Sequence, residues 1–515
     1  MARLGRPRLA ALLACAIVAL CAHRDAQAQD MTDARLFVPV PDGDPKNPSR
    51  FRKPAFGNPP GFGAGTTGFV STNTTRLKQA PRPTETATLP PLAPVDQTVP
   101  AVYRELPAGN RRPRRVTATP QPYAPPPRVQ VVRRGPLDED PFGPLGIRVG
   151  SFILKPSIEI VGGYDSNVTR TPERQGSWLT TVLPELQFKS DWTRHELSGT
   201  LRGAYTWYEQ LPSFNKPLID ARVNGRVDIT SQTRADLEGR YQLLADSPGD
   251  PNTPGDTARP PIYQIFGGTA GLTQRFNRLE MTGKGSVDRL QYFNATLDTG
   301  GTLDLSDRNY NQYGVAGRVG YELHPGVKPF VEGGFDRRLY DDAAYTIPNR
   351  NSDGRTLKGG VAFELSRKLT GEVAVGYTAR DYVGPGLQPI SGMIYDGSLI
   401  WIATPLSTVR FDLKSAVEEV VQPGVSGALK RDATVQIDHS FRRWLVGSLK
   451  FGIGRDDYVG MDRLDHRYLA SAALTYKMTR TVHIKGEYRY EWLRSNVTGA
   501  DYDANIVMLS LKLQR

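Results

Sequence analysis

Few residues of this sequence are spaced for chemistry. The nearest approach to an acid–base pair is His483 with Glu487, beside Lys485 and Arg489 on one face of an expected strand. Neighbours on a strand face are about 7 Å apart, and mixed charges there are more typical of a polar wall than of an acid and a base. The sequence contains no HExxH, GxSxG or P-loop motif. We therefore expect no catalytic residue, no enzyme activity and no cofactor.

Metal sites are equally poorly supported. The aspartates Asp246, Asp250 and Asp256 share one polar segment, but they lack the twelve-residue ligand spacing of a calcium loop, so we expect a solvated loop. Both cysteines, Cys15 and Cys21, fall in an apolar N-terminal segment that we expect to be removed. The remaining chain then has no thiol for a disulfide or a zinc site.

Charged residues are most regularly spaced between residues 202 and 240. They alternate with Val, Ile, Leu, Ala and Gly, so that each expected strand has one charged and one apolar face. A face with serial charges suits a water-filled lumen better than a dry core. The predicted lumen-lining residues are Arg202, Asp220, Arg222, Arg226, Asp228, Asp236, Glu238 and Arg240.

Two interpretations of these eight residues stay open. Neighbouring strands lie about 4.8 Å apart, so the charges can form a mixed ladder across the wall. In one interpretation, opposed charges create a transverse field that filters polar or ionic solutes. In the other, they neutralise one another and only keep the wall wet and in register.

Similar alternation runs from Pro156 to the C-terminus, in segments of about ten residues. Tight turns and long polar connections alternate between the segments, as periplasmic turns and extracellular loops do. We therefore predict an all-β fold over residues 141–515, a transmembrane antiparallel β-barrel of about 18 strands (16–18). The eighteen segments begin near residues 156, 178, 196, 218, 234, 262, 278, 310, 327, 355, 369, 391, 407, 431, 445, 467, 481 and 504.

The N-terminal part has a different composition. Residues 1–28 combine arginines, an apolar run and Ala26-Gln27-Ala28, which indicates a secretory signal peptide. Residues 29–140 hold 21 of the 41 prolines, so we expect a disordered periplasmic arm. Of the net charge of +12, only +3 belongs to residues 141–515, and with secretion this argues against nucleic acid as a partner.

One basic run in the arm has two interpretations. The segment Arg111-Arg112-Pro113-Arg114-Arg115 is suited to contact peptidoglycan or another anionic envelope polymer through charge. The simpler interpretation is a solvated linker. The other partners that we expect are the lipid of the outer membrane and the barrel assembly machinery.

The motif Gly163-Tyr164-Asp165-Ser166-Asn167-Val168, just after the first expected strand, resembles the opening motif of outer-membrane β-barrel proteins of the alphaproteobacterial porin-2 type. The resemblance extends over roughly residues 150–515 and implies a location in the outer membrane. Some relatives of this type are associated with exopolysaccharide secretion loci, and no catalytic residues transfer with the resemblance. The chain departs from a common barrel ending, because it finishes on Leu513-Gln514-Arg515 and not on an aromatic residue.

Three functions fit these observations. A polar lumen in a barrel of sixteen to eighteen strands predicts a channel for passive diffusion of small polar solutes. The resemblance and the arm suggest, as an alternative, a conduit or accessory protein for polysaccharide export. A closed structural barrel that anchors the arm is the third.

Overall fold

The computed structural model describes residues 141–515, except 251, 254–256, 342–348, 367 and 423. The expected signal peptide and the expected arm, residues 1–28 and 29–140, lie outside the described residues. Within the described part of the chain, no helix is both long and apolar enough to cross a membrane.

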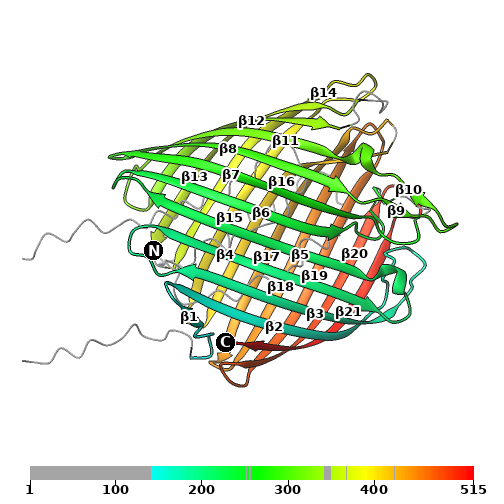
Figure 1. The fold of residues 1–515 in the computed structure, drawn as a ribbon, viewed down its shortest axis with the longest axis horizontal. Helices are drawn as coiled ribbons and strands as arrows, with labels where there is room; N and C mark the ends of the chain where they lie inside the picture. Colours follow the sequence, from blue (N-terminus) through cyan, green and yellow to red (C-terminus); the bar gives the residue numbers. More distant parts are fainter. Residues whose placement is uncertain (1–140, 251, 254–256, 342–348, 367, 423) are drawn as a thin grey trace, which may run out of the picture. The chain divides into compact units, whose positions relative to one another are not determined.

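Eighteen long strands follow one another along the chain (Figure 1). They are β2 (Phe152–Asp165), β3 (Ser177–Ser190), β4 (Glu196–Tyr208), β5 (Lys216–Asp228), β6 (Thr233–Ala245), β7 (Ile262–Phe276), β8 (Leu279–Tyr292), β11 (Tyr310–Tyr321), β12 (Val327–Tyr340), β13 (Ser352–Ser366), β14 (Leu369–Tyr382), β15 (Ile390–Thr404), β16 (Ser407–Glu419), β17 (Gly427–Arg442), β18 (Leu445–Val459), β19 (Leu464–Lys477), β20 (Val482–Ser495) and β21 (Tyr502–Gln514).

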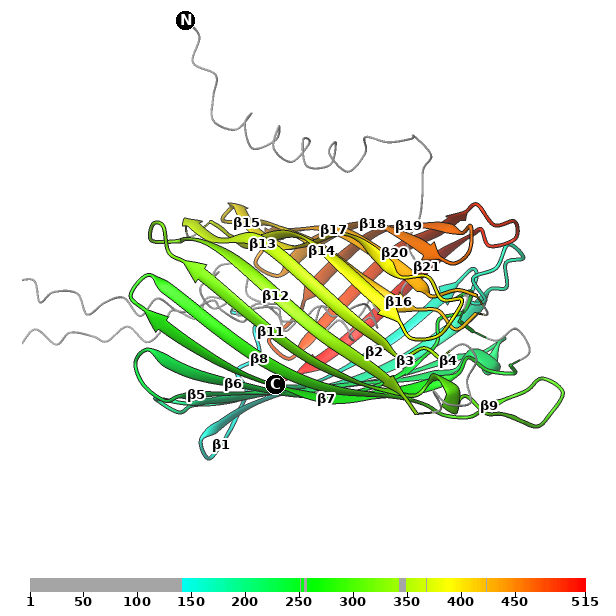
Figure 2. The ribbon, with the colours of Figure 1, turned by 90° about the horizontal axis from the view of Figure 1, so that it is seen from above.

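These strands form one closed antiparallel barrel. Each pairs with the next along the chain, β8 pairs with β11, and β2 pairs with β21 to close the ring. The near and far walls cross in direction in Figure 1, and Figure 2 shows the same oblique course, because strands must tilt for a sheet to close. The short strand β1 (Ile147–Val149) pairs with the start of β2, and β9 (Ala295–Thr296) and β10 (Thr302–Leu303) form a small hairpin.

The fold class and the strand count predicted from alternation are confirmed, and every predicted start lies within four residues of an observed one. Short turns, such as residues 229–232 and 277–278, lie at one end of the barrel, which we call the turn end. Long connections, such as residues 166–176 and 246–261, lie at the other, the loop end. Asn277 has a φ of 54° in its two-residue turn, a left-handed conformation that asparagine tolerates.

Several strands extend further towards the loop end than the sequence suggested. The strand that was expected to begin near residue 467 starts at Leu464 as β19, while β18 continues to Val459 and its Asp456 is paired to Asp465. Backbone hydrogen bonds do not need apolar side chains, so the ladder continues where the alternation ends.

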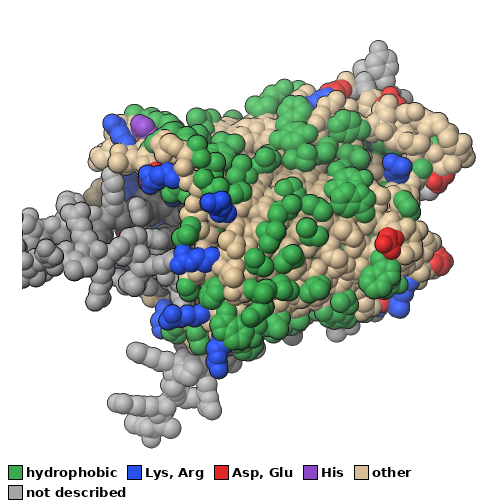
Figure 3. Space-filling view, turned by 60° about the horizontal axis from the view of Figure 1, so that its bottom comes forward, with side chains coloured by type: hydrophobic (Ala, Val, Ile, Leu, Met, Phe, Trp, Pro, Cys, Tyr) green, Lys and Arg blue, Asp and Glu red, His purple; other side chains and the backbone are tan. Residues whose placement is uncertain are grey.

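The two faces of the wall differ as the alternation requires. Val223 on β5 is 42% exposed, while its neighbour Arg222 is 8% exposed on the opposite face. Figure 3 shows hydrophobic side chains spread over the outside of the barrel and most charged side chains near its two ends. An apolar outer band of this kind is suited to lipid.

Candidate functional site in the barrel interior

The eight predicted lumen residues lie on β4, β5 and β6, on the face opposite the exposed apolar residues. Arg202 and Arg222 are buried and the other six are half-buried, whereas Val223 and Val227 between them are exposed. The register of the strands places Arg202 beside Asp220 and Arg226 beside Asp236. At these two positions unlike charges therefore face each other across neighbouring strands.

Arg240 makes the shortest ion pair of this group. Its guanidinium binds both carboxylate oxygens of Asp288 on β8, at 2.7 and 2.5 Å, and also Glu238 at 3.1 Å. The strand β7 lies between β6 and β8, and its residue in the same row is Gly267. A side chain at Gly267 would collide with the Asp288 carboxylate, so this glycine leaves room for a bond across three strands.

Three partners of the other predicted residues, Glu185, Glu196 and Arg234, lie outside the predicted set. Arg202 lies 3.4 Å from Glu185, and Arg226 lies 3.8 Å from Glu196 and 3.5 Å from Asp228. Asp236 accepts a hydrogen bond of 2.8 Å from Arg234. Alternation indicates the face on which a residue lies, but it does not indicate which neighbour across the sheet becomes its partner.

Arg222 differs from the others. Its Nε is buried and has no hydrogen-bond partner among the described residues. Asp220, two residues away on the same face, interacts with the Arg222 charge, whereas the register places a second cation, Arg240, directly opposite Arg222.

A second charge ladder, which the sequence analysis did not predict, crosses β11, β12 and β13. Arg318, Glu332 and Lys358 occupy one row of the register, so the signs alternate from strand to strand. Glu332 lies 3.6 Å from Arg318 and 3.1 Å from Lys358. Arg318 also forms two bonds of 2.8 Å to Glu372 on β14. The interior is thus charged on more than one side, with cations and anions in pairs.

A contact at the loop end joins distant parts of the wall. Asn252, in the connection from β6 to β7, donates to the carbonyl of Glu419 at 3.0 Å and accepts from the Val421 amide at 2.9 Å. Arg308 donates to the Asn252 carbonyl at 2.8 Å. The shorter way round the ring from β7 to β16 passes β8 and β11 to β15, so these bonds reach across the opening.

A cavity of about 260 Å³ lies inside the barrel against β2 to β6, β20 and β21. Val168 and Arg170 from the first long connection and Pro248 from the third line it near the loop end. Deeper in, its lining includes the predicted residues Arg202 and Asp220. The space accommodates a small solute beside both cations and anions.

The structure does not bring together the two residues of the acid–base candidate, His483 and Glu487. His483 and Glu487 are four residues apart on β20, which corresponds to roughly 13 Å along a strand. His483 lies 3.4 Å from Gln514, whereas Glu487 binds Arg489 at 2.8 Å and Ser471 at 3.1 Å. Among the described residues, no group of three or more His, Cys, Asp or Glu could hold a metal ion. Asp256 lies outside those residues.

Several solved structures are similar to this chain. OpdK from Pseudomonas aeruginosa is 12% identical, with 70% of this chain and 99% of that chain covered and a TM-score of 0.36. OpdO from the same organism is 15% identical, with 70% and 97% covered and a TM-score of 0.37. A BenF-like porin from Pseudomonas fluorescens Pf-5 is 12% identical, with 71% and 100% covered and a TM-score of 0.37.

No curated protein matches the chain in sequence. The family model described as "Putative beta-barrel porin 2" matches residues 140–515, which include every strand of the barrel. The chain therefore belongs to this porin family and is a β-barrel protein of the bacterial outer membrane.

Proposed function

We propose that the barrel is a channel for the passive diffusion of small polar solutes. The observation that carries this proposal is the interior itself, where ion pairs line a cavity of about 260 Å³ beneath the connections of the loop end. Paired charges keep the wall hydrated without a large net field, so the channel favours polar solutes with weak selectivity for charge.

Single-channel recording tests this function. Purified protein that shows heat-modifiable migration in detergent gels is added to a planar lipid bilayer, and the current is measured at several voltages. A diffusion channel gives discrete steps with a linear current–voltage relation, whereas the same protein unfolded by heat gives none. Inserted, folded protein without any conductance contradicts the proposal.

A closed structural barrel is the second candidate, and the bonds of Asn252 across the opening favour it. They narrow the loop end, which also argues against a wide conduit for a polysaccharide chain. Absence of conductance in the recording above is the result expected of a closed barrel.

A further inference from the structure

The motif at Gly163–Val168 lies where the two ends of the barrel meet. We call the junction of β2 with β21 the seam. It pairs nine positions, Ser157–Asp165 with Ile506–Gln514, whereas β2 pairs fourteen positions with β3. Towards the loop end β21 continues to Tyr502, beyond the last residue of β2. The edge of Tyr502–Asn505 that faces β2 therefore has no strand beside it, and its backbone groups need other partners.

Residues of the motif occupy this free edge. The Ser166 amide donates to the Asn505 carbonyl at 2.9 Å, and the Asn505 amide donates to Ser166 Oγ at 2.8 Å. The Asn167 side chain donates to the Asp503 carbonyl at 3.0 Å. Asp503 and Asn505 are two residues apart, so their backbone groups point to the same side of β21. Ser166 and Asn167 thus continue the ladder past the end of β2.

The chain turns sharply away after these contacts. The Asn167 amide donates to the Asp165 carboxylate at 2.9 Å, which is the bond of an Asx turn. Arg170 follows with a φ of 53°, a left-handed conformation that is unfavourable for arginine. Such a conformation persists only where its surroundings hold it in place.

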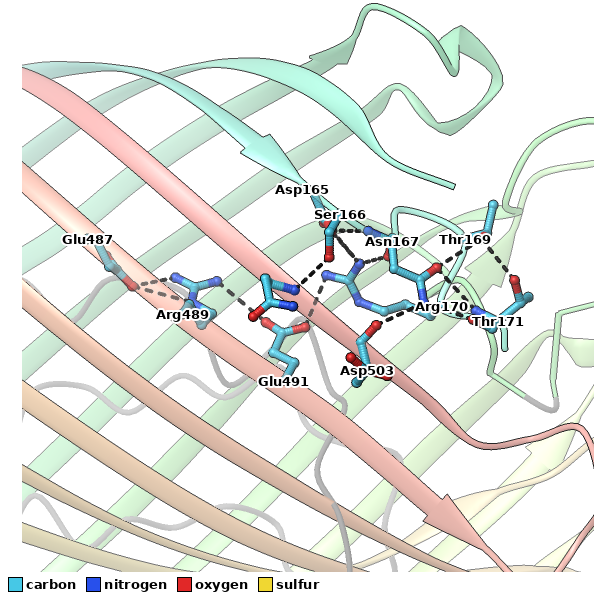
Figure 4. A network of polar contacts seen from close by, with 11 residues as sticks. Asp165, Ser166, Asn167, Thr169, Arg170, Thr171, Glu487, Arg489, Glu491 and Asp503 are labelled. Atoms are coloured by element: carbon cyan, nitrogen blue, oxygen red, sulfur yellow. Dashed lines mark hydrogen bonds and ion pairs between the residues drawn. The ribbon is translucent and has the colours of Figure 1, made fainter. Parts of the chain in front are cut away.

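Figure 4 shows what holds Arg170. Its guanidinium lies 2.9 Å from the Asp165 carboxylate and 3.0 Å from Glu491 on β20. Burial alone lowers the pKa of this guanidinium, but the charges of Glu491 and Asp165 outweigh burial and raise the pKa. The ion pairs connect the first strand of the barrel to the last hairpin, β20–β21.

We propose that residues 165–170 are a latch that keeps the seam closed. Adjacent strands at the other junctions follow one another along the chain and are joined by a turn or loop, whereas β2 and β21 are joined only by non-covalent contacts. The latch adds backbone pairing through Ser166 and Asn167 and a buried ion pair to Glu491. It also sets Val168 and Arg170 in the cavity lining. This role is independent of whether the barrel conducts.

Hydrogen exchange of the full-length protein in detergent tests the latch. In Arg170→Met, amides of residues 157–165 and 506–514 should exchange about tenfold faster than in wild type, because Asp165 and Glu491 lose their cation. Amides of β7 and β8 should keep wild-type rates. The matched control is Arg240→Met, which removes a similarly buried cation from Asp288 in the middle of the wall and should leave the seam protected.

A milder variant keeps the test decisive if Arg170→Met does not assemble. Ser166→Ala removes only the hydroxyl that accepts from Asn505, and it should speed exchange at residues 502–506 without changing β7 and β8. Wild-type protection of the seam in the assembled variants overturns the latch. Equal acceleration in β7 and β8 also overturns it, because the effect would then be general instability.

Discussion

Val223 and Asn224 are neighbours on β5 that face opposite sides of the barrel wall. Arginine on the lipid face near the membrane midplane costs about 2 to 4 kcal/mol. At position 224 the register places Glu238 opposite, which would compensate a new cation. We expect Val223→Arg to reduce the yield of folded, heat-modifiable barrel in outer-membrane fractions much more than Asn224→Arg does. Equal yields would show that the register assigned to this strand is wrong.

Arg222 and Arg226 test whether the charge ladder acts on permeating ions. Replacing both by Ala leaves Asp220, Asp228 and Glu196 with less compensation, since Arg226 lies within 4 Å of the last two. Reversal potentials in a salt gradient should therefore shift towards cation selectivity. The control Asp236→Ala with Glu238→Ala removes two anions from the neighbouring strand and should shift selectivity towards anions.

The two interpretations of the ladder separate in this experiment. If the charges only neutralise one another outside the permeation path, both double variants keep the wild-type reversal potential while they still insert and conduct. Shifts of opposite sign show that these strands line the path.

The connection between β6 and β7 gives a prediction for a single element. Asn252 bridges to the backbone of Glu419 and Val421, so Asn252→Ala removes two bonds across the opening at the loop end. We expect a larger or noisier single-channel conductance, because the connection loses its hold on the opposite wall. The neighbouring variant Thr253→Ala loses only a bond to Ser247 within the same connection and should conduct like wild type. Unchanged conductance in Asn252→Ala would place the passage elsewhere.

Elements were predictable from the sequence to different degrees. The strands follow from alternation, because a wall between lipid and water selects residue types with a period of two. The cross-strand partners do not follow, since alternation leaves the register between strands open. Arg240 illustrates this difference: its face was predicted, but its bond to Asp288 depends on Gly267 in the strand between them. The bonds from Asn252 to the backbone of Glu419 and Val421 likewise depend on closure of the barrel, which brings these distant parts of the chain together.

At the scale of the whole molecule, the ring of backbone pairing is complete within residues 152–514. β2 pairs with β3 on one edge and with β21 on the other, so the barrel of described residues has no unpaired strand. Closure of this kind removes the unpaired edge strands through which other sheets pair with further chains and aggregate. The sequence predicted the even number of strands, whereas the role of the Gly163–Val168 motif at the seam required knowledge of which strand lies beside β2.

Complete closure leads to a prediction about residues 29–140. These residues are rich in proline and poor in apolar patterning, so the sequence gives no reason for them to add a strand. A chain that keeps residues 1–28 and joins them to residue 141 should still be exported and inserted. Its barrel should migrate as a heat-modifiable band in the outer-membrane fraction, with the same unfolding temperature as the full-length protein. If the shortened chain is degraded or accumulates in the periplasm, residues 29–140 take part in assembly and the predicted domain boundary is wrong.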